Sequence, residues 1–151
     1  MTEELLGANL KVIGIVRNGI RQRPESGWQG IVSELVIDSH LTEALDGLEE
    51  FSHIIVIYWM HQVSPLDKVA TKVHPQGRQE LPLVGFFATR APYRVNPVGV
   101  TTVRLLERQG NILKVEGLDA VDGTPVIDIK PYIPEHGAIS EAKVPSWVTK
   151  R

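Results

Sequence analysis

The sequence lacks cysteine altogether, since none of its 151 residues is one. Disulfide bridges and thiolate metal sites are therefore excluded. Histidine is sparse as well, and no two of the five histidines have the i, i+4 spacing of a helical zinc site. We therefore expect no metal site.

Long apolar runs are also missing. No stretch reaches the roughly 20 apolar residues of a membrane-spanning helix. The opening MTEELLGANLKVIG has neither the basic start nor the apolar core of a signal peptide. A cytoplasmic protein without a membrane partner is expected. Net charge is small, at −2, whereas proteins that hold nucleic acid through overall charge are usually basic. An RNA partner would therefore need a local cluster of positive side chains.

The sequence is rich instead in short strand patterns, which turn signals separate. Continuous apolar character at residues 53–59 suggests a strand buried on both faces. One short helix is expected from Asp38 or Ser39 to near Gly47, and residues 63–82 form a long excursion with three prolines. Strands are expected at residues 10–16, 31–37, 53–59, 84–88, 98–107, 111–118 and 126–129.

This pattern predicts a mostly β protein, a compact single-domain β-barrel over residues 1–151 with one or two short helices. The core is expected at about residues 9–138, with a weakly patterned tail after it. Barrel closure removes the unpaired edges of an open sheet. No glycine-rich loop follows the first strand in a βαβ pattern, so a Rossmann fold is not expected.

A turn at residues 88–99 carries two arginines, Arg90 and Arg94, and Asn96 between prolines. The planar guanidinium donates two parallel hydrogen bonds, which suits a carboxylate or a phosphate. A rigid turn with solvated arginines is the alternative.

A second turn places two carboxylates, Asp119 and Asp122, before Gly123. They could accept hydrogen bonds from a ribose or an amine, or act as a base. In the alternative, Asp122 simply binds the backbone of its own turn.

A third polar pair, His61 and Gln62, follows the strand at 53–59. His61 could exchange a proton or bind a ligand. It could equally be a strand-end histidine that faces water.

Together, these segments form an ordered set of motifs. They are IGIVR at 13–17, GLEEFSHI at 47–54, HQ at 61–62, GFFATR at 85–90, NPVG at 96–99, LD at 118–119, DGTP at 122–125 and DIKPY at 128–132. In this order they resemble the TsaA-like (TrmO-type) family of S-adenosylmethionine-dependent tRNA methyltransferases over nearly the whole chain.

The resemblance implies a β-barrel homodimer that binds S-adenosylmethionine near the subunit interface. It implies N6-methylation of threonylcarbamoyladenosine at position 37, next to the anticodon of threonine tRNA. The alternative is a module that binds S-adenosylmethionine but acts on, or senses for, a different substrate. Some family members carry an additional C-terminal domain, and where that domain helps to hold tRNA, the RNA contacts of this chain must differ.

Site residues follow from the same resemblance. Asp119 and Asp122 are candidates for a catalytic base. Cofactor contacts are expected at Ser26, Gly27, Trp28, His61, Gln62, Arg90, Val100, Gly117, Leu118 and Asp119. Substrate contacts are expected at Arg94, Asn96, Lys130 and Tyr132, and at Arg21 and Arg23 in the first loop. Val95 stands where the family usually has a proline, which removes one restriction on φ.

Overall fold

The computed structural model describes residues 9–63 and 70–148. The strands are β1 Gly14–Arg17, β2 Val32–Ile37, β3 His53–Trp59, β4 Lys72–Val73, β5 Val84–Gly85, β6 Val98–Gln109, β7 Ile112–Glu116 and β8 Pro125–Pro131. The 3-10 helices are η1 Ser39–Leu45, η2 Leu48–Glu50, η3 Pro75–Gly77, η4 Phe86–Ala88 and η5 Ser146–Val148, and α2 is Pro134–Gly137. No helix in these ranges is long and apolar enough to cross a membrane.

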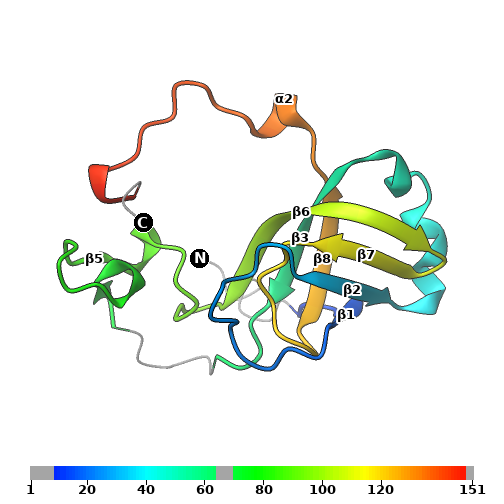
Figure 1. Ribbon diagram of the computed structural model, residues 1–151, viewed down its shortest axis with the longest axis horizontal. Coiled ribbons are helices and arrows are strands. Elements are labelled where there is room, and N and C mark those ends of the chain that lie inside the picture. The colour runs from blue at the N-terminus through cyan, green and yellow to red at the C-terminus, as the bar shows by residue number, and fades with distance from the viewer. Residues whose placement is uncertain (1–8, 64–69, 149–151) are drawn as a thin grey trace. The chain divides into compact units, whose positions relative to one another are not determined.

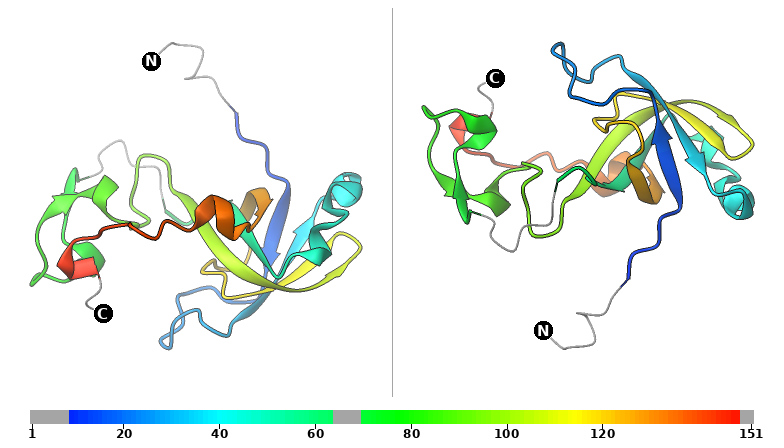
Figure 2. Two further views of the ribbon diagram at one scale, coloured as in Figure 1. Left: turned by 90° about the horizontal axis from the view of Figure 1, so that it is seen from above. Right: turned by 90° about the horizontal axis from the view of Figure 1, so that it is seen from below.

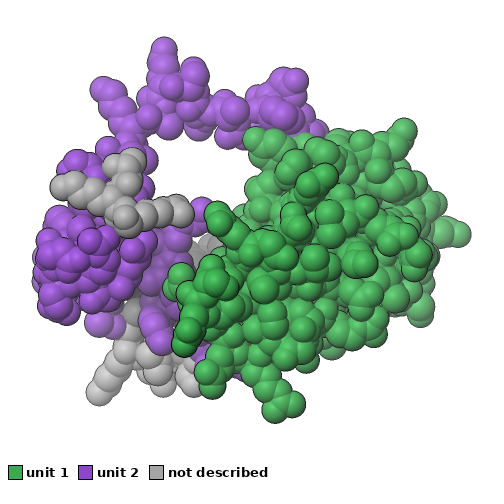
Figure 3. Space-filling view, in the orientation of Figure 1, with its two compact units in different colours: residues 1–61, 98–132 green, residues 62–97, 133–151 purple. Residues whose placement is uncertain are grey.

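Two compact units divide the chain (Figure 3). Unit 1 comprises Met1–His61 and Val98–Tyr132, and unit 2 comprises Gln62–Pro97 and Ile133–Arg151. The expectation of one domain over residues 1–151 stays a prediction.

Unit 1 is a closed barrel in which the strands follow the order β1-β2-β7-β6-β3-β8 (Figures 1 and 2). Every neighbouring pair is antiparallel, including β1 with β8, the pair that closes the circle. The prediction of a mostly β barrel without a Rossmann pattern is confirmed. Because the strands alternate in direction, β1, β3 and β7 end where β2, β6 and β8 begin. We call this edge of the barrel the Asp119 end.

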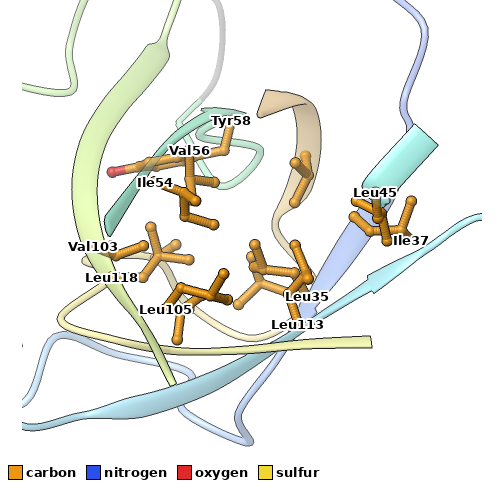
Figure 4. Packing of buried hydrophobic residues seen from close by; sticks show 14 residues of the cluster. Leu35, Ile37, Leu45, Ile54, Val56, Tyr58, Val103, Leu105, Leu113 and Leu118 are labelled. Atoms are coloured by element: carbon orange, nitrogen blue, oxygen red, sulfur yellow. The ribbon is translucent and has the colours of Figure 1, made fainter. Parts of the chain in front are cut away.

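Alternation along the strands builds the core (Figure 4). Ile54, Val56 and Tyr58 of β3 point inward and are buried. They pack with inward residues of the other strands, such as Leu35 and Leu113. The residues between them on β3 are half-buried. Burial of β3 on both faces was therefore wrong, since a barrel strand has one face toward the core and one toward the outside.

Two further strand predictions need correction. The strand expected at 84–88 ends at Gly85 and pairs with β4 in a small separate sheet. It stops there because the backbone N–H and the hydroxyl of Thr89 both donate to the carbonyl oxygen of Phe86, which closes a 3-10 turn. The first strand begins at Gly14 rather than at residue 10. Leu10 and Val12 remain exposed outside the ladder.

At the barrel end opposite to Asp119, the guanidinium of Arg108 joins the β6–β7 hairpin to the η1–η2 segment. Its side chain is only 13% exposed, and it donates to Asp46 at 2.9 Å, Glu49 at 3.2 Å and the carbonyl oxygen of Thr42 at 3.1 Å. A backbone hydrogen bond and then the bond from Arg108 lower the pKa of Glu49. This cluster fixes the end of the barrel that lies away from the candidate site.

Candidate functional site

The Asp119 end gathers polar side chains from three connections of the barrel. These are the loop between β1 and β2, the residues that follow β3, and the turn between β7 and β8. Gly117 links two of them, because its N–H donates to the carbonyl oxygen of Ile31 at 2.9 Å. Its φ of 93° is in the left-handed region that favours glycine. Beyond it, Leu118 is buried and Asp119 is exposed.

Asp119 is held by two hydroxyl groups. Its Oδ1 accepts from Tyr58 at 2.7 Å and from Thr101 at 2.5 Å. Its Oδ2 has no hydrogen-bond partner among the described residues. One oxygen is thus fixed by the barrel, while the other can accept from a ribose hydroxyl or an ammonium group.

Gly99 makes this arrangement possible. It pairs with Tyr58 across β3 and β6, and a Cβ on Gly99 would lie 2.3 Å from Cζ of the Tyr58 ring. The ring therefore lies where a side chain at position 99 would be, and its hydroxyl reaches Asp119. Tyr58 and Thr101 were missed from the sequence. Tyr58 could have been found, because a tyrosine on the buried face of a strand usually requires a partner for its hydroxyl.

Asp122 has a different environment. Its Oδ1 accepts from the backbone N–H groups of Asn18 at 2.8 Å and Gly19 at 2.9 Å. The bonds from Gly19 and Asn18 lower the pKa of Asp122, and the charges of Arg21 and Arg17 lower it further. A carboxylate held in this way anchors the first loop to the acidic turn and is a poorer proton acceptor.

Asn18 completes that anchor. Its side-chain amide donates to Ser33 Oγ and to the carbonyl oxygen of Ala120, both at 2.9 Å, and its Oδ1 accepts from the N–H of Ile20. Asn18 was also missed, although the Asn-Gly pair that it forms with Gly19 is a turn signal.

Several other predicted cofactor contacts lie near this end of the barrel. The Nε2 atom of His61 would lie 3.9 Å from a Cβ on Gly123, so the imidazole is close to the acidic turn. Trp28 is half-buried on the first loop, which also carries Ser26 and Gly27. Val100 is 45% exposed on the outer face of β6, beside Ile57. Leu118 is fully buried, so a ligand could touch only its backbone.

The structure does not bring all predicted residues together. Lys130 and Tyr132 lie at the opposite end of the barrel, where Lys130 pairs with Asp128 at 3.2 Å and the Tyr132 ring packs edge-on against His53. Arg21 and Arg23 are exposed on the first loop. Gln62, Arg90, Arg94 and Asn96 belong to unit 2.

Within unit 2, the turn after β5 is rigid. Arg94 donates through Nη1 to the carbonyl oxygens of Thr89 at 2.8 Å and Ala91 at 3.2 Å. Its guanidinium carbon lies 5.9 Å from the ring centroids of both Phe86 and Phe87. Arg90 and Asn96 are exposed on the same turn.

No group of three His, Cys, Asp or Glu side chains within residues 9–63 and 70–148 is arranged to hold a metal ion. The chemistry that the described residues offer is therefore that of hydrogen-bond acceptors and one imidazole at the Asp119 end, and of arginines and aromatic rings in unit 2.

Comparison with known proteins identifies the family. The family model of the tRNA-methyltransferase O N-terminal domain matches residues 18–138. The chain belongs to this family. A probable S-adenosyl-L-methionine-binding protein of Methanothermobacter thermautotrophicus is 45% identical over 127 residues, which cover 82% of this chain and 88% of the relative. An S-adenosyl-L-methionine-binding protein of Archaeoglobus fulgidus is 42% identical over 136 residues, covering 87% and 94%.

Solved structures of the family agree. The crystal structure of TrmO from Pseudomonas aeruginosa matches with a TM-score of 0.72 and 31% identity, over 95% of this chain and 62% of that chain. The resemblance to TrmO-type proteins is thus confirmed. Because this chain spans less than two thirds of that TrmO chain, the activity of the whole protein is a proposal here.

Proposed function

We propose that this chain is a methyltransferase that uses S-adenosylmethionine and modifies tRNA, with threonylcarbamoyladenosine at position 37 of threonine tRNA as its substrate. Family membership and the names of the relatives support the cofactor. The observation that carries the proposal is the fixed carboxylate at the Asp119 end.

The residues present fit this cofactor. S-adenosylmethionine supplies an activated methyl group on a sulfonium, and carries a ribose and an ammonium group that both donate hydrogen bonds. Asp119 offers an acceptor without a partner among the described residues, and Gly117 has open space beside its Cα. His61 and half-buried Trp28 add an imidazole and an apolar surface.

The distribution of charge between the two units supports binding of the cofactor by unit 1 and of RNA by unit 2. Unit 1 holds 14 of the 18 acidic residues and eight of the 16 basic ones, which gives it a formal charge of −6. Unit 2 holds the other eight basic residues and four acidic ones, which gives +4. A cationic sulfonium suits unit 1, whereas a polyanionic RNA suits unit 2. The small net charge of −2 is thus the sum of a negative unit 1 and a positive unit 2.

Alignment of the two reactants is the main catalytic task, because the methyl donor is already activated. The carbamoyl group of the substrate acidifies the N6 hydrogen, so a modest base is sufficient. We assign Asp119 as the candidate acceptor of that proton, and Asp122 as the anchor that holds the first loop in place.

Asp119→Asn tests the cofactor site. Asparagine keeps one acceptor oxygen but replaces the other with a donor, so we expect S-adenosylmethionine affinity to fall by about tenfold or more, the cost of losing a bond to a charged group. The matched control is Glu43→Gln, an exposed carboxylate on η1 at the opposite end of the barrel. Equal affinities for the two variants in calorimetry would remove Asp119 from the site.

A symmetric homodimer is part of the proposal. The outer face of β3 and β6 carries an apolar row of Ile55, Ile57, Trp59, Val98 and Val100. A second copy could cover such a face. One chain has a mass of 16.8 kDa. Light scattering at micromolar concentration should give twice this mass, and the mass of a single chain would contradict this part of the proposal.

A second candidate function is a cofactor-binding module that acts on a different substrate. The names of the archaeal relatives, which mention binding and no transfer, favour it. Methyl transfer to a panel of RNAs and small molecules separates the two functions.

A further inference from the structure

The most exposed aromatic ring described is in unit 2. Phe87 is 80% exposed, although phenylalanine is among the residues most often buried. Its neighbour Phe86 is buried, with the two ring centroids 4.3 Å apart. One side of the Phe87 ring is thus supported by the protein, and most of the ring is left to the solvent.

The backbone that carries Phe87 is held firmly. The N–H of Phe86 donates to the carbonyl oxygen of Thr71 at 3.0 Å, and its own carbonyl oxygen accepts both the N–H and the hydroxyl of Thr89. The hydroxyl of Thr89 in turn accepts from the N–H of Ala91. An exposed ring on a fixed turn is preorganised for binding, because the backbone that carries it has little conformational freedom to lose when a ligand binds.

Positively charged side chains lie on the same turn as this ring. The Arg94 guanidinium lies 5.9 Å from its centroid and uses only Nη1 in hydrogen bonds to described residues, which leaves Nη2 and Nε as donors. Arg90 is exposed on the same turn. Lys72 is exposed as well and makes no ion pair with any described residue. Tyr93 is a second exposed aromatic residue there, at 60%. Unit 2 as a whole has a formal charge of +4.

Aromatic rings flanked by arginines on a positive surface suit unpaired nucleobases, which stack on the ring while the cations contact the phosphates. We propose that Phe87 is a stacking platform for an unpaired base of the RNA substrate, with Arg94 beside it as a phosphate contact. This rests on the proposed function for the identity of the RNA. A second copy of this chain is the other occupant, and the surplus of positive charge favours RNA over it.

Binding of a threonine tRNA anticodon stem-loop, with 2-aminopurine in the loop, tests the platform. Alanine substitution of a stacking aromatic typically weakens binding by about 5- to 150-fold. We expect a loss in this range for Phe87→Ala, together with loss of 2-aminopurine quenching. The salt dependence should stay at its wild-type value, since stacking releases no counterions. Phe87→Tyr, which keeps a ring, should bind within about threefold of wild type.

The matched control is Leu83→Ala, because Leu83 is another exposed apolar residue of unit 2, at 54%. It should bind RNA as the wild type does. Thermal melting and S-adenosylmethionine affinity show that each variant is folded. Unchanged RNA affinity of Phe87→Ala would overturn the proposal, and so would conversion of a dimer to a monomer by this substitution, which would place a second copy on the ring.

The proposed function can fail separately. If the wild type binds the RNA and Phe87→Ala does not, but no methyl group is transferred, the platform stands and the enzyme assignment falls. If the wild type methylates tRNA and Phe87→Ala binds equally well, only the platform falls.

Discussion

Gly99→Ala should disturb the candidate site through the ring of Tyr58. The added Cβ would lie 2.3 Å from Cζ and 2.7 Å from the hydroxyl oxygen of Tyr58. Carbon atoms in ordinary contact are about 3.5–4.0 Å apart, so the ring must move by roughly 1.2–1.7 Å. The hydroxyl now donates to Asp119 at 2.7 Å, and a hydrogen bond between oxygens, about 2.5–3.0 Å long, is not kept through a displacement of this size unless the carboxylate moves as well.

The expected loss of stability has three contributions. Overpacking costs about 1–3 kcal/mol. Loss of the bond to the exposed Asp119 adds about 1 kcal/mol. Alanine restricts the unfolded chain and so offsets about 0.4–1 kcal/mol. The net destabilisation is about 1–4 kcal/mol, which at about 3 °C for each kcal/mol in a chain of this length lowers Tm by about 3–12 °C.

Thermal unfolding followed by circular dichroism measures this effect. Gly85→Ala is the matched control, because the nearest atom to its Cβ would be the Thr71 carbonyl oxygen at 3.8 Å. In a Tyr58→Leu background, Gly99→Ala should cost less, since the ring that it meets is gone. The reasoning is refuted if Gly99→Ala is as stable as Gly85→Ala and binds S-adenosylmethionine with wild-type affinity.

Three further predictions concern charged residues. Asp122→Asn should lower Tm more at pH 7 than at pH 3. The lowered pKa means that the stabilisation by Asp122 is complete above the unfolded value of about 4 and is lost as pH falls through the folded value; a difference in Tm that does not change with pH would contradict this. Arg108→Met should lower Tm by several degrees because Asp46, Glu49 and the Thr42 carbonyl lose their donor; melting no lower than that of exposed Arg104→Met would argue against the cluster. Arg21→Ala and Arg23→Ala should each reduce the salt dependence of tRNA affinity by about 0.7–0.9, without a change in cofactor affinity; an unchanged slope would remove the first loop from the RNA surface.

The barrel was predictable because its signals are local. The strand at 53–59 was placed to the residue, and the β6–β7 hairpin was found from its turn, which Gly110 makes with a φ of 59°. The end of β5 at Gly85 was not predictable. It depends on hydrogen bonds from Thr89 that apolar residues at 86–88 do not reveal.

The candidate site was predictable in part. Motif order identified Asp119 and Asp122, but not that two hydroxyl groups hold the first while two backbone N–H groups hold the second. That difference depends on Asn18, which is more than 100 residues away in the sequence. Pairing of Tyr58 with Gly99 is another contact that depends on which strands become neighbours, here β3 and β6.

The most direct test of the central claim is methyl transfer to threonine tRNA. The wild-type chain is incubated with S-adenosylmethionine labelled in its methyl group, and with tRNA that carries or lacks the threonylcarbamoyl group at position 37. The proposal predicts label in the modified tRNA alone, recovered at N6 by nucleoside mass spectrometry. Equal label in both tRNAs, or label in neither while the cofactor is bound, would contradict it.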